Sequence, residues 1–260
     1  MLFRSGIGIT TQPLENPVLR AHFGMQKAHS GVLVTAVQFG SSAWGRLEVG
    51  DVLMELDGLR IADNGTVRYR GRFRCQFDVV LGEHFVGDRI RAKVLRAGKR
   101  LDVVMTMQPM AWLVPRYEYD QQPSWFACGG LVFQKLTAEY LRVWGDNWWD
   151  KAPKEFLHFY HSGERTEGQQ EIIVLSQVLA DEVNVGYEPF HNDYVVEVNG
   201  VKPRDLRQFV QIVDGAKQQV VVRTGSGGTV LLDAASARAA QKRIQQQYHV
   251  PGDRSPDLQR

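Results

Sequence analysis

Two stretches of the chain share one pattern of hydrophobic and polar positions. Residues 50–58 read GDVLMELDG and residues 192–200 read NDYVVEVNG, so each places a short apolar strand between a polar turn and a final Asp-Gly or Asn-Gly. Such dipeptides are typical of tight hairpin turns. A strand rich in β-branched residues precedes each copy, at residues 31–37 and 172–178. The repeat predicts two copies of one small β-rich module.

A helix and a closing hairpin are expected after each repeat. In the first copy, apolar positions recur at helical spacing over about three turns: Phe73, Phe77, Val80, Leu81 and His84. In the second copy the same spacing joins Leu206, Phe209, Val210 and Val213. The closing hairpins are predicted at residues 89–107, turning at Ala97-Gly98, and at residues 220–232, turning at residues 225–228.

The segments between and after the modules set the predicted domain boundaries. Residues 109–123 contain prolines and aromatic residues, which indicate an extended linker that packs against its surroundings. Residues 234–248 are rich in Ala and Gln and predict a helix, after which we expect a frayed tail at residues 251–260. We therefore expect a first domain over residues 1–108 and a second, divergent domain over residues 124–250.

A long insertion in the second module carries many large rings. Between residues 137 and 168 these are Tyr140, Trp144, Trp148, Trp149, Phe156, Phe159 and Tyr160. Aromatic side chains are mostly found in protein cores. The insertion is therefore predicted to be a helical cap that buries its rings against the sheet, in preference to a surface for a ligand or partner.

Composition and charge exclude several function classes. With 260 residues, 43% hydrophobic and 23% charged, the chain is long enough for two globular domains that each bury a core. The 31 basic and 29 acidic residues nearly cancel, and no extended run of one sign could follow a phosphate backbone, so no nucleic-acid partner is expected. No apolar run approaches the ~20 residues that cross a bilayer, so no membrane partner is expected. The sequence leaves the cellular compartment open.

Residues suited to metal, redox or cofactor chemistry are few. Cys75 and Cys128 fall in different predicted domains, so no disulfide between them is expected. Of the histidines only His158 and His161 lie three positions apart, and this pair by itself predicts no metal site. We expect no cofactor.

The start of the first module has the form of a loop that binds a carboxylate. Residues 5–9 read SGIGI, and in such a loop successive backbone N–H groups point into one concavity. A helix over residues 13–23, the strand over residues 31–37, the turn at residues 41–43 and VGDVL at residues 49–53 are expected to follow in that order. This order resembles the PDZ domains that follow the catalytic domain in Deg/HtrA proteases.

The resemblance continues into the second module and covers about residues 6 to 245. Its segments are similar to the unusual second PDZ domain of the plant-type Deg proteases and their bacterial relatives: residues 115–121, 130–133, 136–137, 176–179 and 184–187. It implies a β-rich α+β fold. Two PDZ-like, partly open β-barrels or sandwiches would each be capped by helices, and the second would carry the aromatic-rich helical insertion.

The resemblance also implies a peptide-binding groove in the first module. A C-terminal or extended segment of a substrate would add as a strand beside residues 8–11 and pack against the helix around Phe77 and Leu81. Arg4 either approaches the carboxylate or stays solvated. The implied peptide-binding residues are Arg4, Gly6, Ile7, Gly8, Ile9, Thr10, Thr11, Phe77, Val80 and Leu81.

The second module departs from this pattern at its loop. The equivalent residues are Gly130, Leu131, Val132 and Phe133, and this alignment places Val132 where a glycine would permit unusual dihedral angles. Together with the aromatic insertion, this departure predicts a structural or oligomer-forming role for the second module, in a homo-oligomer.

One motif invites a catalytic interpretation. Residues 224–229 read TGSGGT, which is similar to the surroundings of a chymotrypsin-type serine nucleophile. Such a serine needs a histidine base, a carboxylate and an oxyanion hole. Ser226 instead falls between two short predicted strands, where three glycines favour a tight turn. We therefore predict no catalytic residue in this chain.

Three functions are compared. The leading one is the substrate-recognition, regulatory and oligomer-forming region of a Deg/HtrA-type serine endopeptidase, whose partners are C-terminal or unfolded polypeptide segments and an upstream protease domain. The alternative is a stand-alone PDZ adaptor or scaffold that binds protein C termini without proteolysis. A hydrolase that uses Ser226 is the third. Because Met1 lies only a few residues before the loop, the protease domain is expected either upstream in a longer reading frame or lost.

Overall fold

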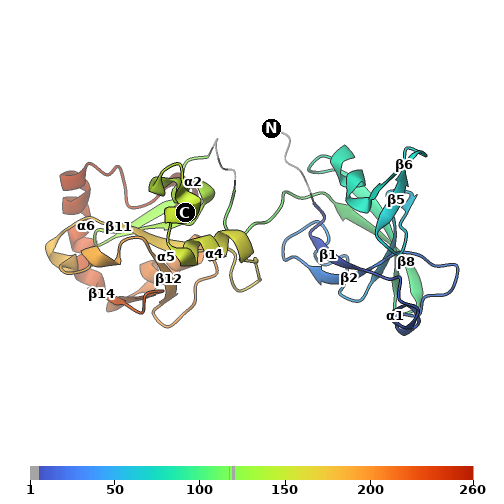
Figure 1. Ribbon diagram of the computed structural model, residues 1–260. Helices are drawn as coiled ribbons and strands as arrows, with labels where there is room; N and C mark the ends of the chain where they lie inside the picture. Colours follow the sequence, from blue (N-terminus) through green and yellow to red (C-terminus); the bar gives the residue numbers. More distant parts are fainter. Residues whose placement is uncertain (1–5, 117, 119–120, 260) are drawn as a thin grey trace. The chain divides into compact units, whose positions relative to one another are not determined.

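Two six-stranded antiparallel sheets, a separate two-stranded hairpin and several helices make up the regular structure of the described residues (Figure 1). The computed structural model describes residues 6–116, 118 and 121–259. The chain divides into an N-terminal unit, Met1–Ala111, and a C-terminal unit, Trp112–Arg260. Among the described residues, no helix has both the length and the apolar character needed to span a membrane.

The N-terminal unit is built on a sheet of strand order β1-β2-β3-β7-β8, with β4 paired to β3. A separate hairpin, β5–β6, and two short helices complete it. The bounds are β1 Ile9–Pro13, α1 Pro17–His22, β2 Val32–Val37, β3 Val52–Leu56, β4 Leu59–Arg60, β5 Thr66–Tyr69, β6 Phe73–Gln76, the 3-10 helix η1 Phe77–Glu83, β7 Arg89–Arg96 and β8 Lys99–Thr106.

The predicted hairpin turns form as their residue types require. Asp57 and Gly58 both have positive φ (48° and 81°), and so do Asn199 and Gly200 in the second copy (48° and 75°). A two-residue turn with positive φ at both positions matches the twist of its flanking strands. The repeat in the sequence therefore corresponds to one local structure formed twice.

Two predicted helices of the N-terminal unit are wrong in part. The helix expected over residues 13–23 begins only at Pro17, after Asn16 caps it through its side chain, and residues 9–13 form β1 instead. Phe73 belongs to strand β6, and the helix that follows is a 3-10 helix of seven residues. The apolar residues do recur at this spacing, but Phe73, the first of them, belongs to the tight β5–β6 hairpin and not to the helix.

The C-terminal unit contains a sheet of order β14-β13-β12-β11-β10-β9. Its strands are β9 Trp125–Cys128, β10 Leu131–Lys135, β11 Ile173–Val178, β12 Asp193–Val198, β13 Gln219–Thr224 and β14 Thr229–Asp233. Its helices are α2 Ala138–Leu141, η2 Arg142–Trp144, α3 Trp148–Lys151, α4 Lys154–Ser162, η3 Glu182–Asn184, η4 Glu188–Phe190, α5 Leu206–Gly215, α6 Ala234–Tyr248 and η5 Pro256–Leu258.

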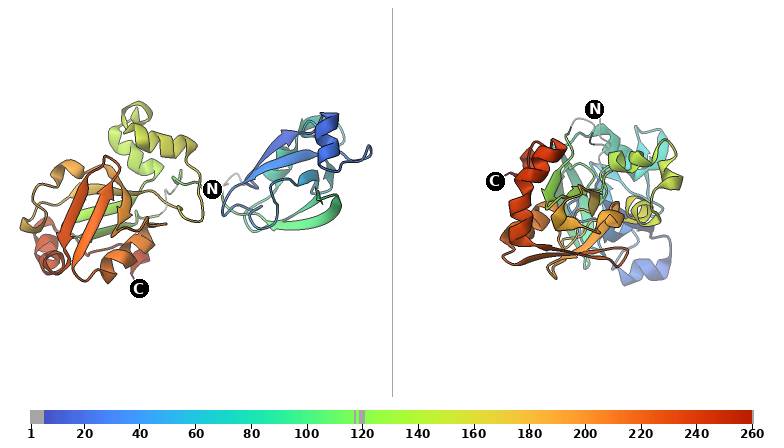
Figure 2. Two further views of the ribbon diagram at one scale, coloured as in Figure 1. Left: turned by 90° about the horizontal axis from the view of Figure 1, so that it is seen from below. Right: turned by 90° about the vertical axis from the view of Figure 1, so that its left-hand side faces the viewer.

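The aromatic insertion forms the group of helices α2, η2, α3 and α4, seen together at one side of the C-terminal unit (Figure 2). Phe156 is fully buried there, and its ring meets Tyr140 and Trp144 edge-on. Leu113 and Val114, from the predicted linker, are buried in the same cluster. The insertion was predicted to be a helical cap that buries its rings against the sheet. It is helical and most of its rings pack in this cluster, but Trp149 is 57% exposed. The predicted linker supplies part of the cluster.

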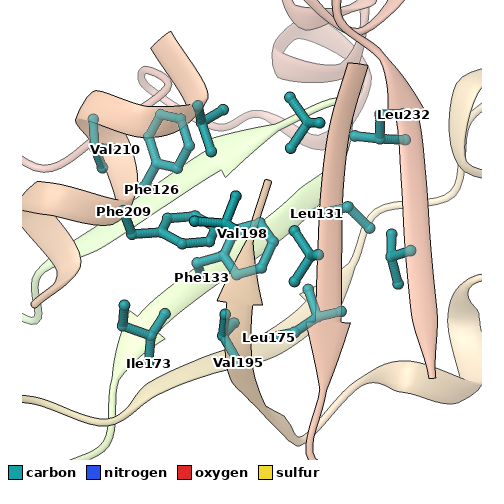
Figure 3. Packing of buried hydrophobic residues seen from close by; sticks show 14 of the residues in the cluster. Phe126, Leu131, Phe133, Ile173, Leu175, Val195, Val198, Phe209, Val210 and Leu232 are labelled. Carbon is teal, nitrogen blue, oxygen red and sulfur yellow. The ribbon is translucent and has the colours of Figure 1, made fainter. Parts of the chain in front are cut away.

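The core of the C-terminal unit lies between its sheet and helix α5 (Figure 3). The ring centroid of Phe209 of α5 lies 4.6 Å from that of Phe133 of β10, with the two rings tilted, and 6.2 Å from that of Phe126 of β9, which it meets edge-on. All three rings are buried. This packing ties β9, at the edge of the sheet, to the helix that covers it.

The prediction of a frayed tail at residues 251–260 is wrong for the described residues. Phe126 and Arg254 form an antiparallel bridge, with the Ala127 N–H donating to the Asp253 carbonyl and the Ser255 N–H to the Trp125 carbonyl. Leu258 is buried in the main core. The tail is ordered because the outer edge of β9 offers it backbone partners.

Candidate functional site

The loop at the start of the N-terminal unit is held from one side through its carbonyl groups. The Gly6 carbonyl accepts from the Ser42 hydroxyl at 3.4 Å, the Ile7 carbonyl from the Ala43 N–H at 3.0 Å, and the Gly8 carbonyl from the Gln38 N–H at 2.8 Å. The predicted turn at residues 41–43 thus holds one side of the loop through hydrogen bonds from Ser42 and Ala43.

The amide groups of this loop remain available. Among the described residues, no acceptor receives the N–H of Gly6, Ile7 or Gly8. Gly8 has φ +73°, and a Cβ at this position would lie 2.2 Å from Cβ of Ser41, so only glycine fits. Successive unpaired backbone N–H groups around such a glycine form a concavity suited to an anion.

Strand β1 leads away from the loop with one unpaired edge. It is the first strand of its sheet and pairs through its inner edge with β2, from Ile9↔Val37 to Pro13↔Val32. In the described part of the chain no strand pairs with its outer edge. An edge strand of this kind accepts an added strand through main-chain hydrogen bonds.

Helix η1 and the loop share one hydrophobic cluster. Val80 and Leu81 are buried in it together with Ile7, and Phe77 and Ile9 pack against it while partly exposed. The apolar residues expected from the helix and from the loop therefore meet. A side chain of an added strand would find Phe77 and Ile9 accessible at this place.

The structure brings nearly all the predicted peptide-binding residues into one region. Gly6, Ile7, Gly8 and β1 with Ile9, Thr10 and Thr11 form the loop and strand, and Phe77, Val80 and Leu81 lie on η1. Thr10 is exposed and sits beside a register shift in the β1–β2 pairing. Arg4 lies outside the described residues.

The loop of the C-terminal unit has the same backbone arrangement, but a buried side chain also holds it in place. The Gly130 carbonyl accepts from the Leu179 N–H at 2.7 Å, as the Gly8 carbonyl accepts from Gln38. Asn184, fully buried, donates to the Gly129 carbonyl at 2.7 Å. A Cβ at Gly130, where φ is +82°, would lie 2.3 Å from the Asn184 side chain. Gly130 is thus the counterpart of Gly8.

The predicted alignment of Val132 with the glycine position of the loop is therefore wrong. Val132 does not occupy a glycine position, because it lies inside strand β10, opposite Gln177 of β11. It packs against the cluster of Leu179, Ala240 and Ile244. The sequence alignment of the two loops was shifted by two positions.

A different feature fills the groove of the C-terminal unit. Strand β9 pairs along the outer edge of β10, from Leu131↔Cys128 to Gln134↔Trp125, in the place where an added strand would lie. Phe126 of β9 reaches Phe209 of α5, as a bound side chain would reach the helix. The edge of β10 is thus already paired within the chain. The run Trp-Phe-Ala-Cys-Gly-Gly before β10 is a hairpin signal that could have predicted this.

Two residues with possible reactivity are held in structural roles. The Ser226 hydroxyl donates to Oδ2 of Asp193 at 2.6 Å, and the Ser226 N–H donates to the same oxygen at 3.2 Å, which fastens the β13–β14 turn. Burial raises the pKa of the Cys128 thiol to about 11, so the thiol is protonated at neutral pH. Within the described residues, no group of three or more His, Cys, Asp or Glu side chains is arranged to hold a metal ion.

Comparison with known proteins identifies relatives along nearly the whole chain. A model of the PDZ domain family matches residues 114–257. "Protease Do-like 2, chloroplastic" of Arabidopsis thaliana is 33% identical over 253 residues, which are 97% of this chain and 41% of that protein. "Putative protease Do-like 3, mitochondrial" of the same organism is 28% identical over 256 residues, 97% of this chain and 44% of that protein. The chain spans less than half the length of these relatives.

Among solved structures, one match is the HtrA-type protease AlgW with a decapeptide. It is 22% identical and covers 42% of this chain and 30% of that chain, with a TM-score of 0.32. At this TM-score no residue role is transferred from it.

Proposed function

This chain belongs to the PDZ domain family, with the match at residues 114–257, and is a region related to the Deg/HtrA proteases, and we propose that its N-terminal unit captures polypeptide segments by strand addition. The captured segment is the C-terminal or unfolded part of a substrate. It adds to the outer edge of β1, and its terminal carboxylate is held by the amides of Gly6, Ile7 and Gly8. The predicted kinship with Deg/HtrA proteases, including plant Deg proteins, is confirmed.

The main support for the proposal is that three features of the N-terminal unit open to a peptide occur together. The loop amides have no acceptor among the described residues, the β1 edge has no partner strand there, and Phe77 is only partly buried. A peptide in extended form satisfies all three at once. Main-chain bonds would supply general affinity, and the contact with η1 would select a side chain.

Binding of labelled peptides to the whole chain tests this proposal. A fluorescein-labelled peptide with an apolar last residue should bind about tenfold more tightly as the free acid than as the C-terminal amide, since charge-assisted hydrogen bonds are the stronger kind. Phe77→Asp should remove most of this binding. Val104→Asp is the matched control, because Val104 is exposed on β8, at the opposite end of the strand order. Equal affinity of acid and amide, with Phe77→Asp unchanged, would reject the proposal.

The C-terminal unit has a structural role in this proposal. Its equivalent groove is filled by β9, so a peptide would first have to displace a strand of the chain itself. An oligomer-forming contact is proposed for its helical insertion, supported by the exposure of Val143 (72%) and Trp149 (57%). Sedimentation velocity of the chain and of Trp149→Ser tests this contact, and an unchanged distribution would remove it.

The proposed setting is a serine endopeptidase whose catalytic domain is not part of this chain. The stand-alone adaptor is the alternative, and peptide binding alone does not separate the two. A casein-cleavage assay of the chain joined to the segment that is encoded upstream of it separates the two. Cleavage that increases when the peptide is added supports the endopeptidase, and an upstream sequence without protease activity supports the adaptor.

A further inference from the structure

The nearly neutral charge of the whole chain conceals a local concentration of arginine. Residues 68–74 read RYRGRFR and form the tip of the β5–β6 hairpin (Figure 1). Arg68 and Arg74 are direct cross-strand partners. Like charges placed opposite each other destabilise a strand pair. Pairing across the β5–β6 hairpin therefore does not account for the placement of Arg68 opposite Arg74.

These arginines border a hollow of about 510 Å³, called the arginine hollow. Its charged and aromatic lining consists of Arg60, Asp63, Arg68, Arg72, Phe73 and Arg74. Asp63 is its one acidic lining residue among those described, and its carboxylate is already paired with Arg20 at 2.6 Å. Arg68, Arg72 and Arg74 are exposed and have no acidic partner in the described part of the chain. The hollow is therefore strongly positive.

The arginine hollow lies at the far end of the proposed groove. Leu14, the residue after β1, donates its N–H to the Asp63 carbonyl at 2.8 Å. The hairpin is also fastened to helix η1, since Tyr69 and Arg70 both bond to Glu83. The hollow is thus linked to the end of β1 and to the helix that lines the groove.

The direction of a bound peptide follows from its carboxylate. If the carboxylate lies at Gly6–Gly8, where β1 begins, the peptide runs antiparallel to β1 and its upstream residues leave beyond Pro13. At roughly 3.3 Å per residue, the five residues of β1 match about five residues of peptide, so residues from about the sixth before the terminus reach the hollow.

We propose that the arginine hollow selects peptides with acidic residues about six to nine positions before their C terminus. This inference rests on the proposed capture of peptides by β1. Guanidinium groups bind carboxylates through paired, charge-assisted hydrogen bonds, and Phe73, 53% exposed, offers a face for the aliphatic part of glutamate. A polypeptide is the occupant, because the hollow continues a groove that binds extended backbone.

The test uses the whole chain and labelled peptides that share their last five residues. The upstream positions carry a run of glutamate, glutamine or lysine, and binding is measured by fluorescence anisotropy at low and high salt. The glutamate peptide should bind about tenfold more tightly than the glutamine peptide at low salt, and this preference should shrink to about twofold at high salt.

Two triple variants separate the hollow from general charge. R68Q/R72Q/R74Q should abolish the preference for glutamate and leave the affinity for the glutamine peptide unchanged. R89Q/R91Q/K99Q makes the same change of charge at exposed positions of the same unit and should keep the preference.

The possible outcomes distinguish this inference from the proposed function. If the glutamine peptide does not bind at all, peptide capture itself fails, and the inference fails with it. If both peptides bind equally well, capture stands and only the arginine hollow is rejected. Glutamate-dependent binding that persists after amidation of the C terminus would indicate a general anion surface, for acidic lipid or nucleic acid as well, and would also overturn the inference.

Discussion

One glycine in each loop, Gly8 or Gly130, identifies the loop more reliably than the residue types around it. Gly8 and Gly130 share a positive φ, a carbonyl that accepts from the residue directly after β2 or β11, and a neighbouring side chain that leaves no room for a Cβ. The sequence identified the first of them through its SGIGI context. It misassigned the second, because CGGLVF offers two adjacent glycines and several alignments. Which glycine meets Asn184 is decided by tertiary contacts.

Residue chemistry also predicts a pH response in the N-terminal unit. His29 is buried, and burial together with the positive charges of Arg100, Arg20 and Arg60 lowers its pKa below 6.5. The folded state therefore binds fewer protons than the unfolded state as pH falls through this range, so stability that is present above about pH 6.5 is lost at lower pH.

His29→Asn tests this response. Asparagine can still accept from the Gln26 N–H but does not titrate. The wild-type chain should lose stability relative to this variant between about pH 7 and pH 5. Hydrogen exchange of peptides from β2 and β3, compared at the same pH, measures the difference. A constant difference across this range would show that the pKa of His29 is the same in the folded and unfolded states.

The bounds of an element were predicted correctly where a single local sequence signal determined them. The helix predicted at residues 234–248 is observed as α6 Ala234–Tyr248, since Asp233 caps it and no competing pattern interrupts it. The helix predicted from Phe73 failed, because residues 70–72 form a tight reversal that pairs Tyr69 with Phe73. An apolar period alone does not distinguish a helix from a hairpin followed by a short 3-10 turn.

At the same scale, Arg254 holds the tail element to the sheet. Its guanidinium bonds to both carboxylate oxygens of Asp214, at 2.8 and 3.0 Å, and lies 5.1 Å from the ring centroid of Phe126. The side chain is 15% exposed, and its hydrogen bonds to Asp214 raise its pKa further above the ordinary range. Removing it leaves Asp214 without its charged partner Arg254.

Arg254→Ala should lower the free energy of unfolding of the C-terminal unit by about 2–3 kcal/mol. Arg254→Lys should restore less than half of this loss, because lysine lacks the planar fork. Arg223→Ala is the control, since its pair with Glu197 is exposed and should contribute within about 0.5 kcal/mol. Urea unfolding followed by tryptophan fluorescence reports on this unit, which contains five of the six tryptophans. Equal effects at Arg254 and Arg223 would show that the tail is not held in this way.

For the whole molecule, the contacts between residues suggest another boundary between the units than composition does. Residues 109–123 were predicted to be a linker, and we propose instead that the second folding unit begins at Trp112. Leu113 and Val114 are buried at 3% and 2% exposure among the rings of the insertion. The family match beginning at residue 114 is consistent with this proposal.

Two fragments test this boundary. Fragment 124–260 should be less stable than fragment 112–260 by about 3–6 kcal/mol, the hydrophobic free energy of burying two aliphatic side chains. Fragment 109–260 is the control and should match fragment 112–260, since residues 109–111 belong to the other unit. Urea unfolding of the three fragments measures these differences. If fragment 124–260 is as stable as the others, the boundary lies where composition placed it.

The sequence by itself determined the local events of this protein: the Asp-Gly and Asn-Gly turns, the strands around them, helix α6 and the kinship carried by their order. These features depend on interactions between residues close in the chain, so the local order of residue types predicts them directly. Only the tertiary structure decided that β1 keeps an unpaired edge within the described residues while β9 pairs with β10, that the tail docks on β9, and that Arg68, Arg72 and Arg74 border one hollow with Arg60. Edge pairing depends on which distant segments meet, and so does the place of the contiguous arginine run of residues 68–74 in the fold, and the pattern of single positions does not encode that.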